Sequence, residues 1–306
     1  MISKELVSST VFELFKKAAI LLPDDVKGAI REAYERETHN LAKIHLKGIL
    51  DNIKVSEKRQ WPLCSDTGYP MIFATVGEET SIEGGVAGFE EAVKGAVEAA
   101  TRRVPLRPTV VHPFTLHNPL NNVGAHMPSI DLKFEPVDYI EITAILKGGG
   151  GEFCSGYRTL FRADGFLGVK KFILDQVILY NKRGLGCPPN ILGVGIGGTS
   201  DVCMKLAKQA AVLRPIGDRH PDPEVASLER EILDMLNETG LGPMGSGGDT
   251  TVLDAHVEYA FTHLAFIPVG ISVNCGCFRR ATARIYGDGR VEEKPYPEWF
   301  RRGSLA

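Results

Sequence analysis

The first sixty residues repeat apolar positions at helical spacing. Apolar side chains recur every three or four residues from Val7 onward, which predicts an amphipathic helix. The pattern restarts after Pro23 with two aspartates in the first turn of a second helix, and residues 39–55 continue it in a third. Residues 3–54 therefore predict three helices, which form a helical N-terminal part over about residues 1–60.

Beyond this part, apolar runs and amphipathic segments alternate. Runs rich in β-branched and aromatic residues predict strands at 71–77, 129–146, 190–198, 266–277 and 279–297, the last with a Gly-Asp-Gly hairpin. Segments with helical periodicity predict helices at 81–103, 164–184, 199–213, 221–240 and 250–263. This order predicts a helix-rich α+β fold with a mixed sheet. Because repeats and low-complexity linkers are absent, residues 1–306 are expected to form one domain.

Composition and charge narrow the class of protein. Hydrophobic residues make up 43% of the 306 residues and charged residues 24%, which is ordinary for a soluble globular protein with a sizeable core. The formal net charge is −3 and no long basic run is present, so nucleic acid is not an expected partner. The N-terminus lacks the apolar core of a signal peptide, and no apolar segment approaches the roughly 18 residues of a membrane span. The sequence therefore predicts a soluble cytoplasmic protein without a membrane partner.

Two glycine-rich stretches interrupt the predicted elements. Gly193, Gly195 and Gly198 satisfy the G-x-G-x-x-G pattern between a strand and a helix, which is the context of a dinucleotide-binding turn. The acidic residue needed about 20 positions on would be Asp218, in a predicted loop, so a turn that offers backbone amides to a small anion is the alternative. Four successive glycines at 148–151 exceed what a turn needs. They indicate a close approach of the backbone to a ligand, with a flexible hinge as the alternative.

The passage 104–128 is rich in proline, asparagine and histidine and has no periodicity. It predicts a long loop without helix or strand. Loops of this length inside a compact domain usually carry function, so functional residues are expected in or near it.

Six cysteines are spread along the chain, and in a reducing cytosol they are not expected to form disulfides. Cys154 has no special setting, and Cys203 falls inside a predicted helix, where a packed small hydrophobe is expected. The other four lie next to proline, glycine or a capping residue in predicted turns: Cys64, Cys187, Cys275 and Cys277. A zinc site would favour a C-x-x-C pair, whereas single cysteines in separate loops suit an iron–sulfur cluster. Spacing alone leaves both open.

Four stretches of the sequence, in this order, resemble the class I fumarase family. They are PLCSDTGYP from residue 62, LKGGGGE from 146, CPPNILGVGIGGTSD from 187, and the stretch from GPMGSGGDTT to NCGCFRRATARI at 242–285. The similarity runs from near the start to about residue 290 and is closest to the α subunit of the two-subunit fumarate hydratases and L-tartrate dehydratases. Single-chain members of the family continue into a second domain. The resemblance therefore implies a separate β subunit, and a higher oligomer of αβ pairs.

The resemblance implies an oxygen-sensitive 4Fe-4S cluster held by three cysteines, with one iron open to substrate. The matching motifs place the ligands at Cys64, Cys187 and Cys275. Cys275 lies twelve residues after His263, which is the spacing of the family. Cys277 stands where the family usually has a small apolar residue, and a ligand role for Cys277 in place of Cys275 stays open.

The resemblance also implies a hydro-lyase acting on a small dicarboxylate, with fumarate/malate as the expected pair and L-tartrate as the alternative. This chemistry needs fixed carboxylates, a polarised hydroxyl and a group that moves a proton. Asp66 and His263 are assigned catalytic roles. Substrate contacts are implied for Ser65, Asp66, Arg107, Gly149 and Gly150. The alternatives are a turn role for Asp66, a core role for His263 and, for the whole chain, a nucleotide- or zinc-binding module.

Overall fold

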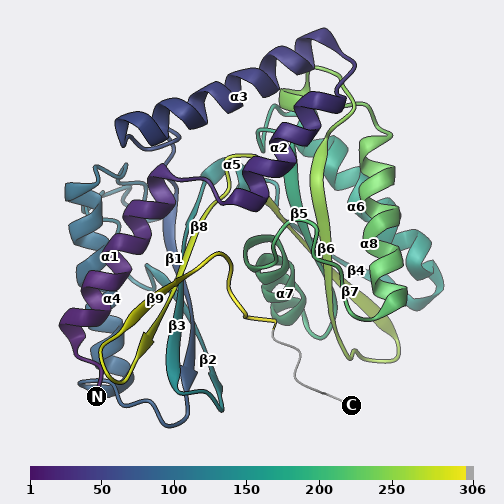
Figure 1. The fold of residues 1–306 in the computed structure, drawn as a ribbon. Coiled ribbons are helices and arrows are strands. Elements are labelled where there is room, and N and C mark those ends of the chain that lie inside the picture. Colours follow the sequence, from purple (N-terminus) through teal and green to yellow (C-terminus); the bar gives the residue numbers. More distant parts are fainter. Residues whose placement is uncertain (301–306) are drawn as a thin grey trace. The chain divides into compact units, whose positions relative to one another are not determined.

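The computed structural model describes residues 1–300, which form two compact units (Figure 1). The first unit comprises Met1–Pro23, Ile53–Gly148 and the segment from Arg279 onward. The second unit comprises Asp24–Asn52 and Gly149–Phe278. Each unit has its own sheet and its own hydrophobic core. More of the described residues lie in helices than in strands, so the expected helix-rich α+β fold is confirmed.

The first unit is built on a five-stranded mixed sheet. Its strands are β1 (Tyr69–Gly77), β2 (Ser129–Glu135), β3 (Tyr139–Lys147), β8 (Arg279–Tyr286) and β9 (Val291–Lys294). They lie in the order β2-β1-β3-β8-β9. β1 is parallel to β2 and antiparallel to β3, and the remaining pairs are antiparallel.

One face of this sheet forms the core of the first unit with helices α1 (Lys4–Ile20) and α4 (Gly85–Arg103). Alternate residues of the strands point to these helices, as in Ile140 and Ile142 of β3, which are fully buried. The residue between them, Glu141, lies on the other face and pairs with Arg284 at 2.8 Å. The predicted period-two pattern therefore sorts apolar side chains to one face and buried charges to the other.

The second unit is built on a four-stranded mixed sheet in the order β4-β7-β5-β6. Its strands are β4 (Gly156–Phe161), β5 (Asn190–Gly197), β6 (Val252–Ala260) and β7 (Phe266–Asn274). β5 is parallel to β6 and antiparallel to β7. Its helices are α2 (Asp24–Arg36), α5 (Gly149–Phe153), α6 (Gly165–Lys182), α7 (Ser200–Leu213) and α8 (Pro223–Asn237), with short turns of 3-10 helix at Arg162–Asp164 and Pro243–Gly245. Helix α3 (Asn40–Arg59) begins in this unit and ends in the first.

The glycines of the predicted dinucleotide turn are explained by helix packing. Gly193 and Gly195 lie within strand β5, and a Cβ on either would overlap a backbone carbonyl of α7, that of Ala207 or that of Cys203. Glycine therefore lets α7 pack directly on the backbone of β5. A dinucleotide turn needs these glycines after the strand, so the pattern does not mark a nucleotide site here.

The helix expected at 250–263 is wrong, because β6 occupies Val252–Ala260. Its polar residues alternate, and Asp254, His256 and Glu258 are all buried. Ala255 and Val257 belong to the apolar core that α6 and α8 form with the sheet. The period of two was visible in the sequence, but the buried charges made the segment look unlike a strand. β4 was also not predicted, whereas the three N-terminal helices and the other expected helices and strands are present.

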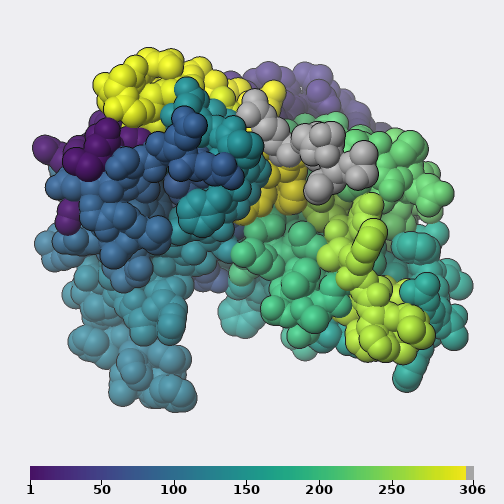
Figure 2. Space-filling view, turned by 90° about the horizontal axis from the view of Figure 1, so that it is seen from below, coloured from purple at the N-terminus to yellow at the C-terminus, as the bar shows by residue number. Residues whose placement is uncertain are grey.

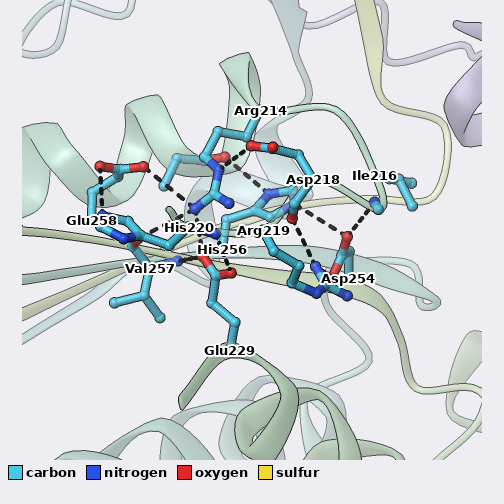
Figure 3. A network of polar contacts seen from close by, with 12 residues as sticks. Arg214, Ile216, Asp218, Arg219, His220, Glu229, Asp254, His256, Val257 and Glu258 are labelled. Atoms are coloured by element: carbon cyan, nitrogen blue, oxygen red, sulfur yellow. Dashed lines mark hydrogen bonds and ion pairs between the residues drawn. The ribbon is translucent and has the colours of Figure 1, made fainter. Parts of the chain in front are cut away.

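The charged residues of β6 belong to a buried network with the chain that follows α7 (Figure 3). Arg214, whose side chain is 1% exposed, donates to Asp218 at 2.8 Å and to Glu229 at 2.5 Å. Asp254 accepts from the Gly217 N–H and from Arg219, both at 2.7 Å. The network fixes the segment after α7 against β6, because each carboxylate drawn there has a donor.

Strand β6 is an edge strand, and side chains bond its outer N–H groups. Asn237 accepts from the Val252 N–H at 2.9 Å, Asp254 from the Ala255 N–H at 2.8 Å, and Glu229 from the Val257 N–H at 2.9 Å.

Among the described residues, no helix is both long and apolar enough to cross a membrane.

Candidate functional site

The turn at residues 63–68 in the first unit holds Asp66. Leu63 is buried at its start, and its N–H donates to the Ala19 carbonyl at 2.8 Å. The Gly68 N–H donates to Asp66 Oδ1 at 3.1 Å, which closes a turn typical of aspartate. A Cβ on Gly68 would meet the Lys147 carbonyl at 2.5 Å, so the turn packs directly against the end of β3. The expected turn role of Asp66 is present, and it leaves Oδ2 outside the turn.

Arg279, the first residue of β8, reaches the same turn. Its side chain is fully buried, and Nη1 donates to the Asp66 carbonyl at 2.8 Å. A Cβ on Gly148 would lie 3.3 Å from Asp66 Oδ2 and 3.5 Å from Arg279 Nη2, so a carboxylate and a guanidinium flank this glycine. Arg279 Nε is buried and has no hydrogen-bond partner, and in the described part of the chain no carboxylate forms an ion pair with this arginine. Its charge is therefore available to an anion.

Arg107 lies beside the same turn. Its backbone N–H donates to Thr67 Oγ1 at 2.9 Å, and its side chain is exposed. The passage 104–128 has neither helix nor named strand, as predicted. It is ordered by Asn122, which is fully buried and donates to the Arg107 carbonyl at 3.1 Å. Figure 2 shows this blue-teal segment projecting from the unit to which it belongs. The structure thus brings Arg107 next to Thr67 and Asp66.

Two cysteine loops meet in the second unit. Cys187 lies just before β5 and Cys275 just after β7, and because these strands are antiparallel both loops are at one end of the sheet. The Gly276 N–H faces the Cys187 carbonyl at 3.4 Å, so the loops are in backbone contact. Cys187 is exposed and Cys275 is half-buried. The structure therefore brings these two predicted ligands together.

The glycine run enters the same end of this unit. Gly149 and Gly150 begin the short helix α5, and a Cβ on Gly150 would lie 3.7 Å from the Gly186 nitrogen. The Cys154 thiol donates to the Gly150 carbonyl at 3.1 Å. Gly150 therefore lies beside the turn that carries Cys187, as expected for a glycine that approaches the site.

His263 lies elsewhere in the second unit. It is exposed in the loop that precedes β7, stacked on Phe266 with the ring centroids 5.1 Å apart. Cys275 follows the other end of this nine-residue strand. At about 3.3 Å per residue, the length of β7 separates the two by roughly 26 Å. The structure does not bring His263 to Cys187 and Cys275, and the core role considered for it is also absent, because the ring is exposed.

The remaining cysteines differ in burial. Cys154 and Cys203 are buried, and their thiols donate to backbone carbonyls. Burial raises the pKa of the Cys203 thiol to about 11, which disfavours the thiolate that metals bind. Cys277 is half-buried and, like Cys275, is adjacent to Gly276. The choice between Cys275 and Cys277 therefore stays a prediction.

The predicted ligands are divided between the units. Cys64 belongs to the first, and Cys187 and Cys275 to the second. Within the described residues, no group of three histidines, cysteines or acidic residues is assembled as a metal site. Site residues of the two units are close in sequence. Gly148 of the first unit is bonded to Gly149 of the second, and only three residues separate Cys275 of the second unit from Arg279 of the first. Three accessible or half-buried thiols in loops are a donor set that fits an iron–sulfur cluster.

Comparison with known proteins decides the family. The family model described as "Fumarate hydratase (Fumerase)" matches residues 8–284, which is most of the chain. The chain belongs to this fumarate hydratase family. The membership and the hydro-lyase class that the sequence motifs predicted are therefore confirmed.

Relatives within the fumarate hydratase family carry more specific names. A protein of Methanocaldococcus jannaschii named "Putative L(+)-tartrate dehydratase subunit alpha" is 46% identical over 287 residues, covering 93% of this chain and 99% of the relative. "L(+)-tartrate dehydratase subunit alpha" of Escherichia coli strain UTI89 is 34% identical over 268 residues, covering 87% and 86%. The strain K12 protein of the same name is 33% identical over the same length. These relatives match over nearly their whole length and are named as α subunits.

Sequence reasoning did not single out two residues at this site, Arg279 and Gly148. The motifs gave no role to Arg279, and Gly148 was noted only as the first of four glycines. A signal for Arg279 was present, since an arginine that opens a predicted strand is a candidate for a buried or anion-binding position. The roles of Ser65, which is exposed in the turn, and of the other predicted residues stay predictions.

Proposed function

We propose that this chain is the α subunit of an iron–sulfur-dependent hydro-lyase that adds water to, or removes it from, a small dicarboxylate. The observation that carries the proposal is the pair of Asp66 and Arg279 beside Gly148. A buried guanidinium that forms no ion pair favours binding of a carboxylate ligand, through two parallel hydrogen bonds. A neighbouring carboxylate can move the proton that hydration requires.

Asp66 is proposed to act on the hydroxyl of the substrate. In the dehydration direction the C–O bond breaks as the C=C bond forms, and protonated Asp66 gives the departing hydroxide the proton that makes it water. In the hydration direction the Asp66 carboxylate takes a proton from water as the C–O bond forms. Oδ2 is proposed for this transfer, because it lies beside Gly148 and near Arg279 Nη2. The second proton, at the adjacent carbon, is assigned to a group of the β subunit.

Substrate carboxylates are proposed to bind Arg279 and Arg107, which both contact the turn at residues 63–68. Backbone amides of Gly149 and Gly150 and the Ser65 hydroxyl are proposed as further contacts, because these glycines carry no side chains and directly follow Gly148 in sequence. We assign no step to His263, given its place at the other end of β7.

Cys64, Cys187 and Cys275 are the residues proposed to hold the 4Fe-4S cluster. All three lie in loops and none is fully buried, whereas Cys154 and Cys203 are buried and bonded to backbone carbonyls. When bound, the cluster supplies a Lewis-acidic iron that polarises the substrate hydroxyl. None of the three cysteines forms a disulfide in the described part of the chain, so each thiol can supply the thiolate that this ligand set needs.

Fumarate and malate are the proposed substrate pair, and L-tartrate is the second candidate. The tartrate candidate is favoured by the printed names of the relatives at 46% and 34% identity. Malate and tartrate differ by one hydroxyl, so Asp66, Arg107 and Arg279 suit both. The same names, which specify a subunit alpha, support a separate β subunit. A higher oligomer of αβ pairs and a cytoplasmic location are proposed along with it.

An anaerobic assay of the chain co-expressed with its β subunit tests the proposal. Malate, fumarate and both enantiomers of tartrate are supplied separately, and formation or loss of the C=C bond is followed by ultraviolet absorbance. Turnover of at least one of them is expected, and it is expected to be far slower when the α chain is reconstituted alone. An iron-loaded αβ pair that turns over none of these acids would contradict the proposed function.

A further inference from the structure

The residue before Cys187 is enclosed by three buried side chains of its own unit. Gly186 has φ +84, and a Cβ on it would lie 3.0 Å from Cys154 Sγ and 3.4 Å from Asn190 Nδ2. The ring of Tyr180 completes the enclosure at 3.4 Å. Cys154 and Asn190 are 0% exposed and Tyr180 is 1% exposed. Only glycine fits this conformation and this space, so the three buried side chains hold the turn in place.

A chain of hydrogen bonds reaches Gly186 from helix α6. The Tyr180 hydroxyl donates to Asn190 Oδ1 at 3.1 Å, and Asn190 Nδ2 donates to the Gly186 carbonyl at 2.6 Å. The Asn190 backbone N–H donates to the Thr251 carbonyl at 3.0 Å, which holds this residue at the start of β5. Because Oδ1 accepts from the phenol, the amide group must face Gly186, and the orientation of Asn190 is unique.

The conformation of Cys187 depends on both of its neighbours. Its φ is +47, in the left-handed region that non-glycine residues rarely adopt unless their surroundings hold them there. On one side the preceding carbonyl, that of Gly186, is bonded to Asn190. On the other side, the carbonyl of Cys187 itself faces the Gly276 N–H. The backbone of Cys187 is thus held at two successive carbonyls.

We propose that Tyr180 and Asn190, with Cys154 packed beside them, position Cys187 for iron binding. We call these three residues the Gly186 support. Helix α6 is already joined to the sheet through Val177, Ile173 and the rest of the apolar core, so the hydrogen bonds to Gly186 are not needed to attach the helix. Their specific effect is on the direction of the Cys187 thiol. The inference rests on the proposed function only in naming iron as what Cys187 binds.

Two variants and one control test the Gly186 support. Asn190→Asp keeps the shape of the side chain and replaces the amide donor by a carboxylate oxygen facing the Gly186 carbonyl. Tyr180→Phe removes only the hydroxyl that orients Asn190. The control is Val177→Ala, a core truncation one turn earlier in the same helix, which destabilises the unit without removing a hydrogen bond to Gly186.

The first measurement uses the full chain without iron, co-expressed with its β subunit. Dibromobimane, which bridges two neighbouring thiols, is added under reducing-agent-free anaerobic conditions, and the Cys187–Cys275 bridge is identified by tandem mass spectrometry. Bridging is expected to be about tenfold slower in Asn190→Asp and several-fold slower in Tyr180→Phe, since small displacements of a reacting group have effects of this order. Val177→Ala is expected to match the wild type. Equal rates in all four proteins, or equal slowing in the control, would overturn the proposal.

The second measurement uses the iron-loaded protein. Loss of visible absorbance in the presence of a chelator is expected to be about tenfold faster in Asn190→Asp than in the control, as for other residues that orient metal ligands. If Asn190→Asp does not fold, Tyr180→Phe decides the result against Val177→Ala. A wild-type protein that takes up no iron would contradict the proposed function, while the bridging rates would still decide whether the Gly186 support positions Cys187.

Discussion

Two buried arginines show how differently this chain uses charge. Arg214, in the second unit, is bonded to Asp218 and Glu229, and Glu258 lies 3.4 Å away (Figure 3). Arg279, in the first unit, is equally buried, but its Nη1 donates to a backbone carbonyl and, among the described residues, no carboxylate forms an ion pair with it. An arginine whose charge is balanced inside the protein stabilises the fold, whereas one held without a counterion is prepared for an anionic ligand. The comparison supports the binding role proposed for Arg279 and a structural role for Arg214.

The largest expected effect is at Asp66, the carboxylate beside Arg279. Asp66→Asn keeps the Oδ1 contact with Gly68 and removes the group proposed to move a proton. Turnover is expected to fall by about 10²- to 10⁴-fold, the usual contribution of a general acid or base, with little change in melting temperature. Steady-state kinetics of the αβ pair and thermal unfolding measure both. Activity within a few-fold of the wild type would remove Asp66 from the mechanism.

Replacing both arginines by methionine tests the comparison directly. Arg214→Met leaves the fully buried Glu229 without its cation, and it is expected to cost about 3–5 kcal/mol of unfolding free energy. Arg279→Met removes a cation that forms no ion pair among the described residues, so its effect on stability is expected to be near neutral while the Michaelis constant rises strongly. Denaturant unfolding and kinetics separate the two. A destabilisation of Arg279→Met as large as that of Arg214→Met would break the comparison.

Serine replacements extend the comparison to the cysteines. Cys64→Ser, Cys187→Ser and Cys275→Ser are each expected to lose most of the bound iron and sulfide. Cys154→Ser, Cys203→Ser and Cys277→Ser are expected to retain most of it. Iron and acid-labile sulfide per chain are the quantities to measure, after anaerobic reconstitution. Full cluster content in Cys275→Ser would transfer the third ligand position to Cys277.

The smallest expected effect is a change in acid stability at Asp254. Burial alone would raise the pKa of this carboxyl, but the hydrogen bond and charge of His256, the Gly217 N–H and Arg219 hold it below its ordinary value of 3.8. A group whose pKa is lowered by folding stabilises the protein fully above the unfolded-state pKa and loses that contribution as the pH falls through the folded-state value. Stability should therefore fall more steeply below pH 3.8 in the wild type than in Asp254→Asn. Equal slopes in urea unfolding between pH 4 and pH 2 would contradict this assignment.

The fold class, the N-terminal helices and most strands followed from hydrophobic periodicity, because amphipathic patterns fix element type in segments of this length. β6 was missed because Asp254, His256 and Glu258 made a buried strand look polar, and only their long-range partners explain why charge is tolerated there. Motifs located the cysteine turns and Asp66. They could not reveal that Arg279 lies beside Asp66, since the two are 213 residues apart in sequence.

His263 shows the opposite limit. Its spacing from Cys275 matched the motif, but a nine-residue strand turns a short separation along the chain into opposite ends of a sheet. The glycine pattern at 193–198 gave a similar lesson, because close packing of α7 on β5 requires the same residues as a phosphate-binding turn. In both cases the pattern is present in the sequence, but the sequence did not reveal where its residues lie in the folded chain.

The bonds made by Asn237, Asp254 and Glu229 to the outer N–H groups of β6 have a consequence for the behaviour of the protein at high concentration. An edge strand with free N–H groups can add a strand from another molecule and so start aggregation. Here the outer donors at Val252, Ala255 and Val257 are already occupied by side chains of the same chain. A newly made chain would therefore be open to this association only until α8 has docked and its Glu229 and Asn237 have closed the edge.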